Sequence, residues 1–177
     1  LVSFKRNRYL CKLYKDVMQH KAGFINIIGN PNVGKSTLMN AFVGERLSII
    51  TSKAQTTRHR IFGIVNGDDF QMVFSDTPGI IKPAYELQTS MMDFVKSAFE
   101  DADILIYMVE VGERELKDES FFKKITHAKV PVLLLLNKID KSNQTHLEEQ
   151  VALWKEQVPN AEIYPISALN NFNVDTV

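Results

Sequence analysis

The segment Gly29-Asn30-Pro31-Asn32-Val33-Gly34-Lys35-Ser36 constrains the fold of this chain more than any other feature. It matches the pattern G-x-x-x-x-G-K-[ST], in which the glycines turn successive backbone N–H groups inward to bind phosphate oxygens. Such a loop needs a strand before it and a helix after it, because the helix N-terminus contributes its dipole to the anion site. The apolar run Phe24–Ile28 precedes the loop and a helix-like run, Lys35–Val43, follows it. The sequence therefore predicts a strand–loop–helix phosphate site.

Short apolar runs alternate with longer helix-like runs over the rest of the chain, which predicts an α/β fold with a mostly parallel sheet. Asn66-Gly67-Asp68-Asp69 is a hairpin signal, so we expect one antiparallel edge strand. Continuous apolar runs are typical of strands covered by helices on both faces. The six expected strands are Phe24–Ile28, Arg60–Val65, Gln71–Ser75, Ile104–Val109, Val130–Leu136 and Ile163–Ile166. The later helices are expected at Leu87–Glu100, Asp118–Ala128 and His146–Gln157, with another beginning near Asn173.

Charge divides the chain into a basic arm and a mildly acidic body. Residues 1–21 hold six of the 21 basic residues and one of the 21 acidic ones, which leaves 15 basic and 20 acidic residues in the rest. The body therefore offers no broad basic surface for nucleic acid.

Cys11 is the only cysteine, and no apolar run approaches the ~18 residues of a membrane span. We expect a cytoplasmic monomer.

The phosphate loop supplies the first group of expected site residues. Lys35 places a point charge on the β- and γ-phosphates, and the Ser36 hydroxyl is a ligand for Mg²⁺, which prefers oxygen. Asp76, in Asp76-Thr77-Pro78-Gly79, ends an apolar strand and can hold Mg²⁺ through water, while the Gly79 N–H can approach the γ-phosphate.

Asn137-Lys138-Ile139-Asp140 decides which base the site accepts. The Asp140 carboxylate can accept hydrogen bonds from N1–H and the amine of guanine together, whereas adenine would leave it unpaired. Lys138 can lie along the base plane, Asn137 can tie the loops together, and the Ala168 N–H in Ser167-Ala168-Leu169 can reach guanine O6. The expected ligands are GTP and GDP. The expected nucleotide-binding residues are Asn30, Asn32, Val33, Gly34, Lys35, Ser36, Thr37, Asp76, Gly79, Asn137, Lys138, Asp140, Ser167, Ala168 and Leu169.

From His20 onward the chain resembles the G domain of the Era-type GTPases, a P-loop NTPase domain in the class that also contains the tRNA-modification GTPases. The segment Ser52-Lys53-Ala54-Gln55-Thr56-Thr57-Arg58-His59-Arg60 carries the resemblance most specifically, because it is similar to the switch I of that family. On this resemblance, residues 1–20 are a basic extension, which is either a genuine part of the protein or a read-through of upstream sequence. Residues 21–177 are then a G domain cut before its last helix.

The resemblance implies a bacterial GTPase of small ribosomal subunit assembly, with a C-terminal KH domain that binds small-subunit ribosomal RNA and lies outside this chain. A peripheral position at the inner membrane face is compatible with it. For residues 1–17 an unstructured tail is favoured over an amphipathic arm for RNA or membrane.

Switch I and the position after Gly79 set the expected mechanism. Thr57, rather than Thr56, is expected to bind Mg²⁺ when the γ-phosphate is present. Ile80 stands where many small GTPases carry a water-orienting glutamine, so we expect slow hydrolysis. By class resemblance a potassium ion held by Asn32 can supply the missing charge, although Asn32 is equally well explained as a loop-shaping residue. Lys35, Thr57, Gly79 and Asn32 are thus the expected catalytic residues.

Three interpretations stay open at this point. The favoured one is a GTPase that gates ribosome assembly. The others are a nucleotide-gated binding module with negligible hydrolysis and another GTPase of the class, such as a tRNA-modification GTPase. For Lys53, Arg58 and Arg60, contact with RNA or protein in one nucleotide state and solvated loop charge are equally good interpretations. For the charged run Glu110–Glu119, a solvated face is the favoured interpretation.

Overall fold

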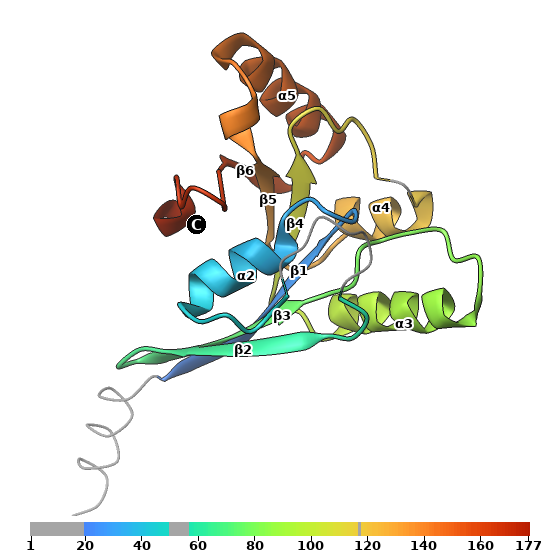
Figure 1. The fold of residues 1–177 in the computed structure, drawn as a ribbon, viewed down its shortest axis with the longest axis vertical. Helices are drawn as coiled ribbons and strands as arrows, with labels where there is room; N and C mark the ends of the chain where they lie inside the picture. Colours follow the sequence, from blue (N-terminus) through green and yellow to red (C-terminus); the bar gives the residue numbers. More distant parts are fainter. Residues whose placement is uncertain (1–19, 50–56, 117) are drawn as a thin grey trace, which may run out of the picture.

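The computed structural model describes residues 20–49, 57–116 and 118–177, which form one six-stranded sheet with helices on both faces (Figure 1). The strand order is β2-β3-β1-β4-β5-β6. Every neighbouring pair is parallel except β2 and β3, which form the predicted antiparallel hairpin at one edge. The elements are β1 (Lys21–Gly29), α2 (Lys35–Val43), β2 (Ile61–Asn66), β3 (Phe70–Asp76), α3 (Glu86–Glu100), β4 (Ile104–Glu110), α4 (Glu119–Thr126), β5 (Val132–Asn137), η1 (Ile139–Lys141), α5 (Gln144–Gln157), β6 (Ala161–Pro165) and η2 (Val174–Thr176).

The core lies in two layers, one on each face of the sheet. Side chains of β4 alternate between them: Leu105, Tyr107 and Val109 pack with α3, α4 and α5, whereas Ile106 and Met108 pack with α2 and the C-terminal segment. This alternation follows from the period of two in a strand. Because both faces are covered, β4 and β5 are almost entirely buried, as their continuous apolar runs predict.

Local chemistry explains where the elements depart from the predicted boundaries. The side chain of Asn143 accepts from the N–H of His146 at 2.9 Å, so α5 begins at Gln144 rather than at His146. Asp118 caps α4 in the same way, through the N–H groups of Ser120 and Phe121. Pro131 has no N–H for a sheet ladder, and β5 begins just after it. Near Asn173 the structure has the short 3₁₀ turn η2.

Arg60 is packed inside the fold, so its interpretation as a solvated or RNA-contacting charge is wrong. Its guanidinium donates to Asp101 at 2.7 and 3.1 Å, to Asn26 Oδ1 at 3.0 Å and to Ser75 Oγ at 3.0 Å. The side chain is only 8% exposed. A planar guanidinium presents five N–H donors, which suits a site with several acceptors around it. Arg60 therefore fixes the start of β2 against β1, β3 and the end of α3.

Asn40 on α2 holds the segment before residue 50. Its Oδ1 accepts from the N–H groups of Leu47 and Ser48 at 3.0 and 2.9 Å, and its Nδ2 donates to the Ser48 carbonyl at 2.8 Å. Gly44, with φ of 75°, ends α2 in the left-handed conformation and turns the chain toward this clamp. The expected switch I, Ser52–Arg60, thus follows a clamp at Ser48 and ends at the anchored Arg60. Its first part, including Thr56, lies outside the described residues.

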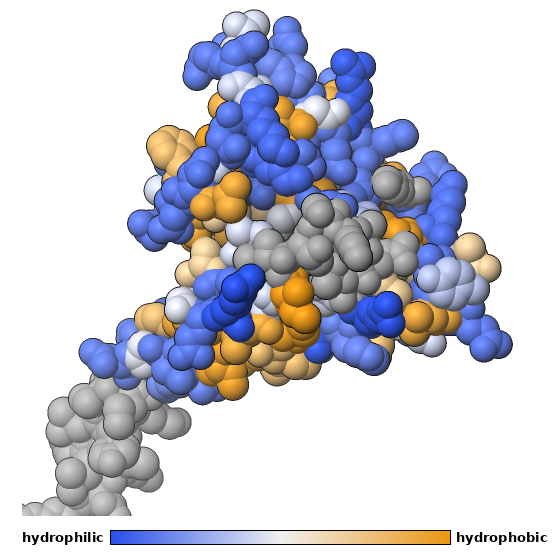
Figure 2. Space-filling model, viewed as in Figure 1, coloured by the Kyte–Doolittle hydropathy of each residue, from blue (hydrophilic) through white to orange (hydrophobic). Residues whose placement is uncertain are grey.

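The surface is unevenly apolar. Figure 2 shows hydrophilic side chains around α5 and a group of apolar ones along the edge where β2 lies, where Phe62 and Ile64 are about half exposed. Within the described part of the chain, no helix is long and apolar enough to cross a membrane.

The Arg60 cluster predicts a stability effect that depends on pH. Burial raises the pKa of Asp101, but the hydrogen bonds from Arg60 and Asn26 outweigh it, so the pKa lies below its ordinary value of 3.8. A carboxylate with a lowered native pKa stabilises the fold above its unfolded pKa and loses that contribution as the pH falls through the native value. Asp101→Asn should therefore reduce the free energy of unfolding by about 1–3 kcal/mol at pH 7.

Urea unfolding of the wild type and the variant, followed at pH 7 and in steps down through pH 3, measures this effect. The difference between the two proteins should shrink as the pH falls below 3.8. Asp93→Asn is the matched control, because Asp93 pairs with Lys96 on the exposed face of α3. A difference that stays constant with pH would mean that Asp101 acts through shape rather than charge.

Candidate functional site

Two glycines set the path of the loop between β1 and α2. Gly29 has φ of 149° and Gly34 has φ of 108°, values that other residues rarely adopt. A Cβ at Gly29 would lie 2.2 Å from the Met108 carbonyl oxygen, and one at Gly34 would lie 2.3 Å from Asn137 Nδ2. Both glycines are therefore needed for conformation and for space. The loop they form wraps the N-terminus of α2, as the motif predicts.

Lys35 lies over this loop with its side chain buried. Its Nζ donates to the carbonyl oxygens of Gly29 at 3.2 Å and Asn30 at 2.8 Å. Burial lowers the pKa of Lys35 to about 8, although the charges of Asp76 and Glu113 oppose this effect. Among the described residues no carboxylate is paired with this ammonium group, which is positioned for an anionic ligand.

Ser36, Thr57 and Asp76 meet at one point, although they come from a helix, a loop and a strand end. Ser36 Oγ donates to Asp76 Oδ2 at 2.7 Å and lies 3.2 Å from Thr57 Oγ1, which lies 3.4 Å from the same carboxylate oxygen. The second carboxylate oxygen, Asp76 Oδ1, is buried and has no hydrogen-bond partner among the described residues.

This oxygen set fits Mg²⁺, which takes one or two carboxylate oxygens with hydroxyls and water. A buried carboxylate oxygen without a donor is costly unless a ligand satisfies it. The described residues hold no cluster of three His, Cys, Asp or Glu side chains that could bind a metal. The Ser36 and Thr57 hydroxyls supply the other protein oxygens beside Asp76.

Gly79 and Ile80 run alongside the phosphate loop. A Cβ at Gly79 would lie 2.7 Å from Pro31 Cα, so only glycine allows this approach, and the Ile80 N–H donates to the Gly29 carbonyl at 3.0 Å. The Ile80 side chain is fully buried in the core layer beneath α3. It therefore points away from the phosphate loop and takes no part in orienting water.

Asn137 joins the phosphate loop to the loop after β6. Its Nδ2 donates to the Val33 carbonyl at 2.7 Å, and its Oδ1 accepts from the Ala168 N–H at 2.9 Å. The expected tie between the two loops is therefore present. Because the Ala168 N–H is already used in this bond, its contact with guanine O6 stays a prediction, and it requires that donor to be shared or released.

Asp140 and Lys138 lie at the carboxyl end of β5. Asp140 Oδ1 accepts from Ser167 Oγ at 2.5 Å, which orients the exposed carboxylate. Lys138 has φ of 65° and donates from Nζ to the Asn32 carbonyl at 2.7 Å. Asn32 itself has φ of 64°, so it shapes the loop in the left-handed conformation that asparagine tolerates. Of the remaining expected residues, Thr37 lies on α2 and the Leu169 side chain is 78% exposed.

Glu110 and Glu113 belong to the site, so the interpretation of this stretch as solvated charge is wrong for both. Glu110 Oε2 accepts from Lys138 Nζ at 2.5 Å. Glu113 accepts from Asn30 Nδ2 at 3.0 Å and from the Glu110 N–H at 2.9 Å. Burial raises the pKa of Glu113, while its hydrogen bonds and the charge of Lys35 oppose this. The only sequence signal was their position just after a buried strand, where open α/β sheets bind ligands.

Comparisons with known proteins point the same way as this geometry. The family model described as "50S ribosome-binding GTPase" matches residues 24–138. GTPase Era of Clostridium beijerinckii is 42% identical over 158 residues, which are 89% of this chain and 53% of that protein. The chain thus spans about half the length of the curated relatives it matches.

Two solved structures are similar. Era in complex with MgGDPNP and nucleotides 1506–1542 of 16S ribosomal RNA has a TM-score of 0.82 and 37% identity, over 90% of this chain and 54% of that one. An Aquifex aeolicus Era variant bound to GDP·AlF₄⁻ has a TM-score of 0.79 and 36% identity, over 88% of this chain and 54% of that one.

The Glu110–Lys138 pair predicts a role for Glu110 in nucleotide affinity. Glu110→Gln removes the charge that holds Lys138 at the base loop, so guanine nucleotide affinity should fall by roughly 10-fold, or about 1.4 kcal/mol. If Glu110 acts through Lys138, the same substitution should change affinity less than about 2-fold in a Lys138→Met background.

Titration of a fluorescent GDP analogue with the four proteins of this double-mutant cycle measures the coupling. Glu149→Gln, an exposed charge on α5, is the control and should leave affinity unchanged. Equal losses from Glu110→Gln in both backgrounds would show that Glu110 does not work through Lys138.

Proposed function

Because this chain belongs to the 50S ribosome-binding GTPase family, as a member of its Era type, we propose that it is a switch domain that binds and hydrolyses GTP. We assign it to cytoplasmic assembly of the small ribosomal subunit, with ribosomal RNA as the partner. The Era relative seen with 16S ribosomal RNA supports this partner. The similarity to Era also favours this assignment over a tRNA-modification GTPase.

The observation that carries the proposal is the convergence of the metal and phosphate groups at one end of α2. Ser36 Oγ lies within 3.2 Å of both Asp76 Oδ2 and Thr57 Oγ1, and Lys35 Nζ lies over the loop beside them. Thr57 is the only one of these groups from the expected switch I. A bound γ-phosphate and its metal ion would therefore bias the position of that segment, which is how GTPase switches work.

Some residues of this chain bind the charged groups of GTP, and others position its base and phosphates. The backbone amides at the start of α2 and the Lys35 ammonium bind the phosphate oxygens. Ser36, Asp76 and Thr57 would hold Mg²⁺, which, when bound, neutralises charge on the β- and γ-phosphate oxygens. Asp140 reads the guanine edge, with its carboxylate already oriented by Ser167. Gly79 brings its backbone close to the γ-phosphate.

One observation favours a second candidate, a nucleotide-gated binding module with negligible hydrolysis. The side chain at position 80 is an isoleucine buried in the core, so it cannot orient the attacking water. Single-turnover hydrolysis of radiolabelled GTP with Mg²⁺ separates the two candidates. Turnover that is slow but well above the uncatalysed rate supports the GTPase. A rate equal to that without protein, together with tight GTP binding, would favour the binding module.

Guanine specificity predicts the behaviour of Asp140→Asn. The amide cannot accept from both guanine donors, so GTP affinity should fall by about 2 kcal/mol, or roughly 30-fold, while xanthosine triphosphate affinity should rise. Competition against a fluorescent nucleotide measures both affinities. Asp68→Asn, at the tip of the β2–β3 hairpin, is the matched control. Unchanged GTP affinity in Asp140→Asn would refute the assignment of this loop to the base.

The absence of a glutamine at position 80 predicts dependence on a monovalent cation. If Asn32 helps to hold potassium near the phosphates, hydrolysis should be roughly 10-fold or more faster in KCl than in NaCl at equal ionic strength, because charge develops on the transferred group. Asn32→Asp should alter this ratio while GTP still binds. Equal rates in the two salts would rule out a role for potassium in hydrolysis. Activation by a partner would then be the explanation for turnover without a glutamine.

A further inference from the structure

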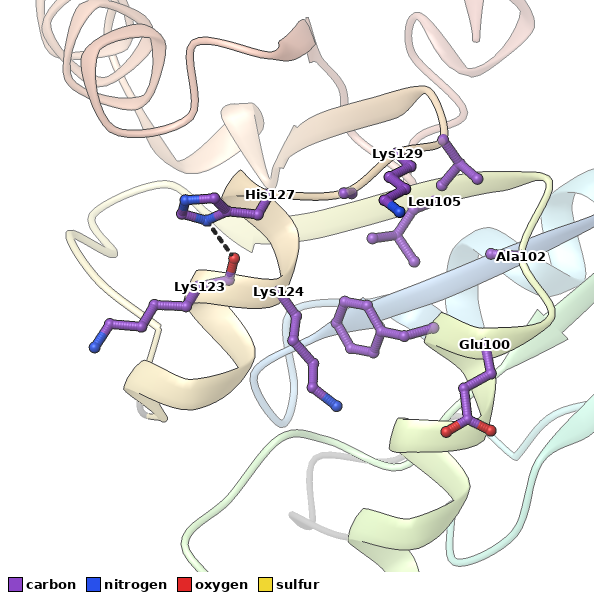
Figure 3. Close-up of a pocket in the computed structure, with 10 residues that line it drawn as sticks. Glu100, Ala102, Leu105, Lys123, Lys124, His127 and Lys129 are labelled. Carbon is purple, nitrogen blue, oxygen red and sulfur yellow. Dashed lines mark hydrogen bonds between the residues drawn. The ribbon is translucent and has the colours of Figure 1, made fainter.

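A hollow of about 630 Å³ lies far from the phosphate loop, at the amino ends of β4 and β5 (Figure 3). The phosphate loop follows the carboxyl end of β1, and β1 and β4 are parallel, so the two sites lie at opposite ends of the sheet. The wall of the hollow is largely apolar: the half-buried Phe99 and Val130 present their surface to it, and Ala102 and Leu105 are buried behind them. Its volume lies in the range of about 300–1,000 Å³ that is typical of small-molecule sites.

The rim of this hollow is basic. Lys123, Lys124, His127 and Lys129 line it, with Glu100 as its acidic member. No ion pair joins any of these lysines to an acidic side chain within residues 20–49, 57–116 and 118–177. In Figure 3 Lys124 and Lys129 extend on two sides of the hollow, whereas Lys123 points away from it.

Stabilisation of a helix end explains only part of this charge. Lys123 and Lys124 lie in the last turn of α4, where positive charge meets the carbonyl end of the helix dipole. Lys129 follows the helix and is not explained in this way. The ammonium of Lys124 lies 5.7 Å from the ring centroids of both Phe99 and Phe121, above the aromatic side of the hollow. Lys124 and Lys129 are both exposed and can turn toward a ligand.

We infer that this hollow binds single-stranded RNA, with one unpaired base against the apolar wall and the neighbouring phosphates on Lys124 and Lys129. An apolar wall beside unpaired lysines matches the two parts of a nucleotide, because a base is flat and apolar on its faces while the backbone is anionic. The identification of that RNA as ribosomal rests on the proposed function. The hollow would give the G domain an RNA contact of its own, separate from the nucleotide site.

The shape of the hollow favours single-stranded RNA over duplex RNA or a membrane. Bases in a duplex are stacked and paired, so they cannot lie against the wall of a hollow. Unpaired bases can be splayed out and can reach it. Binding to a lipid surface needs apolar side chains that protrude beside the basic ones. Here Ala102 and Leu105 are buried behind the lysines, and Phe121 and Ile125 of α4 face the core.

The test compares two double variants with the same change in charge. Lys124→Gln with Lys129→Gln removes the rim charge, and Lys96→Gln with Lys155→Gln removes two exposed lysines outside the hollow. Fluorescence anisotropy measures binding of a labelled 12-nucleotide single-stranded RNA to each protein with GDP at several KCl concentrations. The rim variant should bind at least about 10-fold more weakly, with a slope of log K against log salt smaller by about 1.4, or 0.7 for each lost phosphate contact. The control variant should bind as the wild type does.

Three outcomes would overturn the inference. Equal weakening in both double variants would show that RNA responds only to overall charge. Equally tight, equally rim-dependent binding of a duplex of the same sequence would show a backbone contact without a base. Unchanged RNA binding in the rim variant, with rim-dependent binding to vesicles of phosphatidylglycerol and phosphatidylcholine, would assign the lysines to lipid.

A third variant tests the base pocket without any change in charge. Ala128 is half-buried and lines the hollow, so Ala128→Leu should fill part of it and reduce the preference for single-stranded over duplex RNA, while the salt slope stays the same. Thermal unfolding establishes that each variant is folded. GTP binding should be unchanged in all of them. If the rim variant binds RNA as the wild type does while GTP hydrolysis is intact, this inference alone fails. If the wild type does not bind GTP, the proposed function alone fails.

Discussion

The site depends on close backbone approaches at two glycines. Gly29 lies against the Met108 carbonyl of β4, and Gly34 lies against the side chain of Asn137, the last residue of β5. Neither position has room for a Cβ, and both have positive φ. The loop between them is therefore pressed against the ends of two neighbouring strands, and its N–H groups are held in place before any ligand arrives. Prepositioned donors cost little reorganisation on binding, which is the reason such a loop binds phosphate tightly.

Side chains from distant parts of the sequence connect this loop to the rest of the molecule. Asn137 bonds to Val33 and Ala168, so the phosphate and base loops form one unit. Glu113, bonded to Asn30, extends that unit to the loop after β4. The chain before the expected switch I is held at Ser48 by Asn40, and the end of the expected switch I is held by Arg60. Since Arg60 also bonds to the end of α3, movement near Thr57 has a rigid boundary three residues away.

The sequence predicted the fold and which motif residues would meet around the phosphate loop, because both follow from local patterns. The alternation of apolar runs and helix-like runs gave the six strands and their order of appearance, and the Asn-Gly hairpin identified the antiparallel pair. The motif residues Lys35, Ser36, Asp76 and Asn137 lie where the motifs place them. Glu110, Glu113 and Arg60 were misjudged for one common reason. A charged side chain near a loop looks solvated in a sequence, and its burial depends on partners far along the chain.

The sequence by itself determined which chemistry this chain can perform, because the residue types and spacing of the phosphate and base motifs are local properties. Only the tertiary structure decided how those groups are supported. It brought Thr57 to Asp76, packed Ile80 into the core and paired Lys138 with Glu110. The Thr57–Asp76 and Lys138–Glu110 contacts join residues 19 and 28 positions apart, and their existence depends on how sheet and helices pack. Packing is a property of the whole chain, so no single segment of sequence can specify it.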